Sequence, residues 1–151
     1  MLWRNFFMVS VLMLTSMGSN ATEDSNRVSV FVNYAGSDAI GQHAAMLLQE
    51  LIEDSADYKI APSHEATMKI ALSSLNLDPG KAGGRSAIST VITMRNYLNY
   101  EPAEPQTWYP IFLSSNLVVI DSSMADQFAH DTLSKISAAL EHYREDVRKY
   151  Q

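Results

Sequence analysis

Alternation of apolar and polar residues predicts a first strand near position 28 and a helix after it. Val28, Val30 and Val32 fall on one side of an extended chain, which is the period of a strand. From Ser37, the predicted N-cap, to Ile52, apolar residues recur at helical spacing. Gly41 lies inside this helix, where glycine costs about 1 kcal/mol relative to alanine. We therefore expect the helix to approach the sheet closely at Gly41.

The middle of the chain predicts further strands separated by turns. Tyr58–Ala61 is a short apolar stretch ended by a proline, which is typical of an edge strand. Met68–Leu75 and the β-branched segment Ala87–Tyr97 predict two longer strands. Residues 107–120 predict one long bent strand or two short ones, with Pro110 at an edge or a bulge.

The most regular pattern is an amphipathic helix near the carboxyl end. Ser123 and Asp126 form a capping-box pattern of the S-x-x-D kind. The apolar residues that follow share one stripe: Ala125, Ala129, Leu133, Ile136, Leu140, Tyr143 and Val147. The whole order predicts an α+β fold. It is a two-layer sandwich in which two amphipathic helices cover one face of a mostly antiparallel sheet of four or five strands.

The amino-terminal residues predict an export signal. Arg4 supplies a positive charge, an apolar run extends from Phe6 to Met17, and Ser19-Asn20-Ala21 fits the pattern that signal peptidase cleaves. The run is shorter than the roughly 20 apolar residues that span a bilayer. We expect residues 1–21 to be a signal peptide, residues 22–151 to form one periplasmic or secreted domain, and no stable membrane insertion after cleavage. The alternative is a leader that is retained as an anchor.

Charge and cysteine content narrow the function classes. The net charge is -6, and removing the leader with Arg4 makes it -7. An acidic balance argues against nucleic-acid binding, which needs a basic face to neutralise phosphates. The chain has no cysteine, so its core must hold it without disulfides, and thiol catalysis and cysteine zinc sites are excluded.

A glycine-rich loop, NLDPGKAGGRSAIST from Asn76 to Thr90, superficially resembles a phosphate-binding loop. Pro79 stands where the first glycine of that motif belongs, and proline has no N–H to offer a phosphate. The segment after Ser86 is strand-like, so no helix begins there. We interpret the loop as a hairpin connection, with Lys81 and Arg85 as a minor anion contact.

No residue pattern supports a catalytic or metal site. The histidines His43, His64, His130 and His142 are scattered. The Asp126–His130 and His142–Asp146 pairs could each supply two metal ligands, but the sequence spacing indicates no third or fourth ligand for either pair. The chain also contains no G-x-S-x-G elbow and no S-x-x-K motif. We predict no cofactor, no metal and no catalytic residue, and the chain is more simply explained as a non-enzyme.

A second hairpin is the main candidate for binding. Its tip is acidic and aromatic, and aromatic residues are enriched at binding hot spots. The candidate residues are Tyr97, Tyr100, Glu101, Glu104, Trp108 and Tyr109. The alternative is that these aromatic side chains pack across the strands and only stabilise the hairpin.

Four segments together resemble a group of small exported bacterial proteins without assigned function. They are Val30–Tyr34, Ser37–Ile52, Leu75–Pro79 and Ala87–Arg95. The layout is also similar to the amino-terminal domain of the periplasmic protein TolB and to the periplasmic domain of curli-secretion-type lipoproteins. This chain lacks the lipid-anchored cysteine of the lipoproteins, which puts pore formation in doubt. The resemblance implies a periplasmic, non-enzymatic interaction domain.

Together these observations predict an exported binding or adaptor module of the cell envelope. It would contact an envelope or secreted protein through a sheet edge or the aromatic tip. Two alternatives stay open: an inhibitor of a secreted hydrolase, and a small hydrolase with an unrecognised site. The patterns indicate neither the partner nor the oligomeric state.

Overall fold

A computed structural model describes residues 27–81, 83–95 and 110–149. The elements are β1 (Val28–Ala35), α2 (Ala39–Glu53), β2 (Tyr58–Ile60), β3 (Met68–Asn76), β4 (Arg85–Arg95), β5 (Pro110–Asp121), a short 3-10 helix (Ser122–Met124) and α3 (Ala125–Lys149). The α+β class and the predicted order of elements are confirmed.

The strands form one five-stranded sheet in the order β2-β1-β3-β4-β5. The three strands β3, β4 and β5 make an antiparallel meander. In contrast, β1 pairs in parallel with both of its neighbours, β2 and β3. The sheet is therefore mixed, because α2 carries the chain back to the starting end of β1 before β2 begins.

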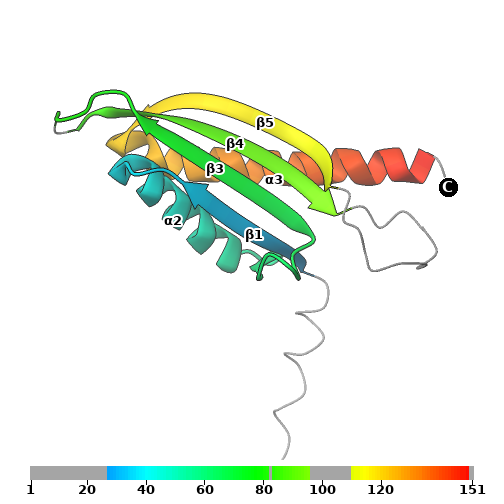
Figure 1. The fold of residues 1–151 in the computed structure, drawn as a ribbon. Helices are drawn as coiled ribbons and strands as arrows, with labels where there is room; N and C mark the ends of the chain where they lie inside the picture. The colour runs from blue at the N-terminus through cyan, green and yellow to red at the C-terminus, as the bar shows by residue number, and fades with distance from the viewer. Residues whose placement is uncertain (1–26, 82, 96–109, 150–151) are drawn as a thin grey trace, which may run out of the picture.

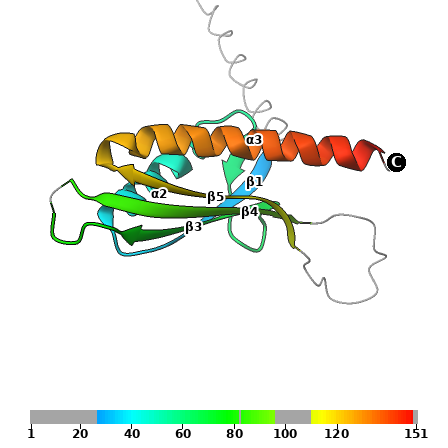
Figure 2. The same ribbon diagram turned by 90° about the horizontal axis from the view of Figure 1, so that it is seen from above.

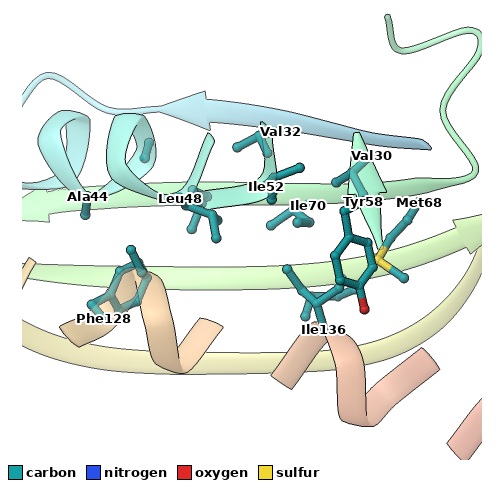
Figure 3. Packing of buried hydrophobic residues seen from close by; sticks show 14 of the residues in the cluster. Val30, Val32, Ala44, Leu48, Ile52, Tyr58, Met68, Ile70, Phe128 and Ile136 are labelled. Atoms are coloured by element: carbon teal, nitrogen blue, oxygen red, sulfur yellow. The ribbon is translucent and has the colours of Figure 1, made fainter. Parts of the chain in front are cut away.

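Both helices lie on one face of the sheet, behind it in the view of Figure 1, and Figure 2 shows the same two layers from above. The core fills the space between the layers. Leu48 and Ile52 of α2, Ile70 of β3 and Ile136 of α3 are all fully buried there. Figure 3 shows their side chains pointing into this space from both layers. The predicted stripe of α3 is thus largely confirmed, although it also buries Phe128 and Thr132.

The predicted cap of the first helix is wrong by one residue. Asp38, not Ser37, is the N-cap of α2, and its Oδ1 accepts a hydrogen bond from the backbone N–H of Gly41 at 2.7 Å. A carboxylate at this position satisfies an N–H that has no partner inside the helix.

Gly41 does mark a close approach of α2 to the sheet. A Cβ atom at Gly41 would overlap the side chain of Ser74 on β3 and would lie 2.9 Å from the hydroxyl of Tyr34 on β1. Glycine is therefore required at this helix position by packing, which explains why the sequence accepts its conformational cost.

The capping box predicted for the second helix is also wrong. Ser123 lies within the 3-10 helix, and Asp121 is its N-cap. The Asp121 carboxylate accepts hydrogen bonds from the N–H of Ser123 at 2.9 Å and from its hydroxyl at 2.6 Å. α3 begins two residues later, at Ala125. The chain thus turns from β5 into α3 around Asp121, at the end of the last strand.

The segment predicted as one bent strand or two is a single strand, β5, at the border of the sheet. Pro110 is its first residue, which agrees with the predicted edge position. Its register against β4 shifts near Leu113: Ser114 pairs with Ile92, whereas Phe112 pairs with Thr93. This irregularity is the bend in the strand.

Candidate protein-binding surface

The aromatic hairpin tip cannot be placed, because all six of its candidate residues lie outside the described residues. They are Tyr97, Tyr100, Glu101, Glu104, Trp108 and Tyr109. The strands on either side do form an antiparallel hairpin, and Arg95 is in register with Pro110. The hairpin itself is therefore as predicted, and the binding role of its tip stays a prediction.

The other candidate pair, Lys81 and Arg85, lies at the predicted hairpin between β3 and β4. Both cations are turned toward one acid, Asp78. Arg85 Nε lies 2.9 Å from Asp78 Oδ2, and Lys81 Nζ lies 3.6 Å from Asp78 Oδ1. The hydrogen bond from Arg85 lowers the pKa of Asp78 and raises that of Arg85 itself. An anion would have to compete with Asp78 for these charges, so the loop's first role is to close its own turn.

A buried polar cluster lies where β1, β3 and β4 meet the start of α2. Ser74 on β3 donates its hydroxyl proton to the Asp38 carboxylate, and the Tyr34 hydroxyl lies 2.6 Å from the Ser74 hydroxyl. Burial would raise the pKa of Asp38, but hydrogen bonds from Ser74, Gly41 and Ser86 together lower it. Asp38 is only 7% exposed. These hydrogen bonds attach the start of α2 to the sheet. The Asp38 carboxylate is the acceptor of these bonds, which gives it a structural role.

A groove of about 420 Å³ lies between the carboxyl-terminal half of α3 and the strands β1 and β2. Val28, Tyr58 and Leu140 form its apolar part. Its charged rim consists of Asp57, Glu141, Arg144, Glu145 and Arg148. The rim carries both acids and arginines, and none of the described residues that line the groove is a histidine, so an acid–histidine pair of the kind used in hydrolase sites is not found among them.

Among the described residues, no group of three histidine, cysteine or acidic side chains is arranged to hold a metal ion. None of the helices in the described part of the chain has the length and apolar character needed to cross a bilayer.

The most unusual surface is the face of the sheet opposite the helices, which we call the open face. Four large apolar side chains are at least half exposed there: Leu75 on β3 and Phe112, Leu117 and Val119 on β5. The registers place Leu75, Ala87 and Val119 side by side in one row across three strands. Leu117 is the most exposed of the four, at 70%.

Along this face charges are scarce. The positions of β3, β4 and β5 that alternate with the buried ones are mainly alanine, serine, threonine, valine, leucine and phenylalanine, and the charges Lys69, Arg85 and Arg95 lie near the ends of their strands. Exposed large apolar side chains gathered on one face are typical of a surface that contacts another macromolecule.

The open face continues into a sheet edge with which none of the described strands pairs. β5 hydrogen-bonds to β4 on one side and is the last strand of the sheet on the other. It is 12 residues long, and no charged residue occurs from Pro110 to Ile120. Proteins normally blunt such edges with charges, proline or very short strands. The opposite edge follows this rule, because β2 has only three residues and proline follows it closely.

The sequence predicted a sheet edge as a contact and an edge or bulge position for Pro110, but it did not indicate the exposed apolar side chains of the open face, for an identifiable reason. The segments Ile111-Phe112-Leu113 and Leu117-Val118-Val119-Ile120 are apolar on both faces, so no alternation marks one face as exposed. The available signal was the absence of charge over eleven residues of a strand with proline at its start.

No family model matches the chain, and no curated protein matches it in sequence. Among solved structures, it is similar to a Xanthomonas campestris protein of the DUF330 family (TM-score 0.45, 10% identity, covering 82% of this chain and 89% of that one). It is also similar to a PelC dodecamer subunit from Paraburkholderia phytofirmans (TM-score 0.42, 15% identity, 73% and 86%). A third likeness is a hypothetical protein from Chlamydia trachomatis (TM-score 0.36, 7% identity, 63% and 72%). Likeness at this level is partial, so function has to be argued from this chain's own surface.

Proposed function

We propose that the protein is an exported, non-enzymatic binding module that holds a protein partner on the β5 edge and the adjoining open face. The observation that carries the proposal is β5 itself, a 12-residue edge strand without a charge before Asp121. Its outer backbone groups are available to pair with an added strand, which is a common way to bind an extended peptide.

The apolar side chains of the open face add to this edge. Phe112, Leu117 and Val119 project from the same strand that would receive the partner. A strand that pairs with β5 therefore brings its own side chains beside these three. Backbone pairing would supply part of the affinity, and the apolar contact would supply specificity for a partner with apolar residues at alternate positions.

A double substitution, Leu117→Lys with Val119→Lys, tests the proposal. Both side chains are at least half exposed, so the fold should tolerate lysine, whereas charge on an edge strand opposes pairing. The immobilised parent protein should retain a partner from a periplasmic extract, and the double variant should lose it. Ser73→Lys is the matched control, because it adds lysine to the same face on the internal strand β3.

Two outcomes contradict the proposal. One is unchanged capture by the double variant. The other is loss of capture only because the variant has unfolded, which a thermal melt by circular dichroism would show. A Trp108→Ser and Tyr109→Ser variant is the companion experiment, since it tests the aromatic tip as the alternative contact. Loss of capture in that variant alone would place the contact at the tip and not on β5.

A further inference from the structure

We propose that the occupant of the β5 edge is a second copy of this chain, paired antiparallel through β5 so that two five-stranded sheets become one continuous sheet. This inference rests on the proposed function, because it names the partner of the same edge. The charge of the chain, the symmetry of strand pairing and the exposed side chains of β5 favour a second copy as the occupant.

Charge comes first. The chain carries a net charge of -6, so two copies repel each other over most of their surfaces. The edge strand β5 does not contribute to this repulsion along most of its length, because it carries no charge from Pro110 to Ile120. Asp121 lies at one end of the strand, and antiparallel pairing keeps the two copies of Asp121 at opposite ends of the contact. The edge therefore offers no charge that would select a different, complementary protein, and no charge that repels a copy.

A two-fold symmetric arrangement allows β5 to pair with its own copy. A two-fold axis perpendicular to the sheet pairs two identical strands antiparallel and keeps the open faces of both copies on the same side. The paired strands then match in length and twist because they are the same strand. The ladder to β4 is regular from Ser114 to Asp121, beyond the irregularity at Leu113. An axis at Leu117 falls within this regular part and pairs residues 114–120 of one copy with residues 120–114 of the other.

The exposed side chains of β5 fit this pairing. With the axis at Leu117, the two Leu117 side chains lie directly opposite each other on the open face, and each Val119 lies opposite the other copy's Ser115. Leu117 is the most exposed of the four large apolar side chains of the open face. The pairing thus brings the most exposed of these side chains into contact with its own copy.

Absence of cysteine from the chain allows a direct test, because any disulfide reports one introduced position. Cβ atoms directly opposite in an antiparallel pair lie about 4.5–5.5 Å apart, close enough to the spacing of a disulfide for one to form after a small adjustment. Mild oxidation of a Leu117→Cys variant, made from the full-length sequence, should give a covalent dimer. The control is Leu75→Cys, which is similarly exposed on the same face but lies on the internal strand β3. It should remain a monomer on a reducing-agent-free gel.

A charge-swap experiment tests the same axis without oxidation. Leu117→Lys and Leu117→Glu each place like charges opposite one another across the axis, so each variant alone should sediment as a monomer. An equimolar mixture should recover the dimer, because it places lysine opposite glutamate. The unmodified protein should sediment as a dimer whose population rises with concentration.

Three results would overturn the inference. One is an unmodified protein that stays monomeric in sedimentation at its solubility limit. Another is equal cross-linking of the Leu75→Cys control, which would indicate packing of open face against open face. The last is a dimer that survives in both single-charge variants. None of these would affect the proposed function, since capture of a different protein by the β5 edge would still be lost in the Leu117→Lys, Val119→Lys variant.

Discussion

The two faces of the sheet are built from the same strands, but the helices cover only one of them. On β3, Met68, Ile70 and Leu72 are sealed beneath the helices, whereas Leu75 on the open face is 65% exposed. On β5 the difference is smaller, because both faces are apolar. Burial, and not hydrophobicity, therefore separates the two faces, and substitutions should divide into those that unfold the protein and those that change only its contacts.

The largest expected effect is on the covered face. Ile70→Ala removes a fully buried side chain from β3 and leaves a cavity between the sheet and the helices. We expect a loss of about 2–5 kcal/mol in the free energy of unfolding, measured by urea denaturation. A loss below about 1 kcal/mol would mean that Ile70 is not part of a closely packed core.

A smaller effect is expected where the helix layer meets the sheet. Gly41→Ala places a Cβ in the space occupied by Ser74, so α2 must shift or Ser74 must move. Although alanine favours helix, overpacking should dominate and cost about 1–3 kcal/mol. Ser74→Gly has a cost of its own, because it removes the hydrogen bond to Asp38, so the two variants are compared in a double-mutant cycle: Gly41→Ala should cost less in the Ser74→Gly background than in the parent. If the single variant is more stable than the parent, α2 does not approach β3 this closely.

The polar cluster under α2 should make stability depend on pH. The pKa of Asp38 is lower in the folded protein than its ordinary value of 3.8. Its ionised form therefore stabilises the fold above that ordinary value, and this stabilisation is lost as the pH falls through the folded-state pKa. Asp38→Ala removes a helix cap and should cost about 1–2 kcal/mol at neutral pH. The difference from the parent should shrink on acidification in urea titrations from pH 7 to pH 3. A difference that is constant over this range would show that the charge of Asp38 does not contribute.

The smallest effect is expected on the open face. Leu75→Ser exchanges an exposed side chain on the same strand as Ile70 and should change the free energy of unfolding by no more than about 0.5 kcal/mol. Urea denaturation beside Ile70→Ala makes the comparison within one strand. A cost similar to that of Ile70→Ala would mean that something covers the open face in the isolated protein.

Much of the fold could be predicted from the sequence because its patterns are local. The period of Val28, Val30 and Val32 identified β1, and the stripe of α3 identified a helix with one buried side. Gly41 even indicated a close contact before its partner was known. Parallel pairing of β1 with β3 could not be predicted, because no local pattern states which strand lies beside which.

The errors at the caps and on the surface have a similar cause. Ser37 and Asp38 are both good N-cap residues, and only the tertiary contacts of Asp38 with Ser74 and Gly41 distinguish them. Ser123 likewise fits the capping pattern, but the N-cap is Asp121, two residues earlier, where the chain turns from β5 into the 3-10 helix. The exposure of Leu117 depends on both helices lying on the other face of the sheet, and Leu75 on the internal strand β3 is exposed for the same reason. The candidate residues of the aromatic tip lie outside the described residues, and their role stays a prediction.

The position of β1 has a consequence for how the chain assembles. β1 is the first strand in sequence, yet it lies inside the sheet between β2 and β3. Its six residue pairs with β3 extend from Met68 to Ser73, so they form only after that part of the chain has been supplied. When the chain is supplied from its amino-terminal end, β1 therefore has no partner on its β3 edge until β3 is available. The later hairpins, in contrast, form between residues that are close in sequence. The rate of folding should then be limited by the arrival of β1 at a meander that is already built, and a chaperone would have its longest opportunity to bind at β1.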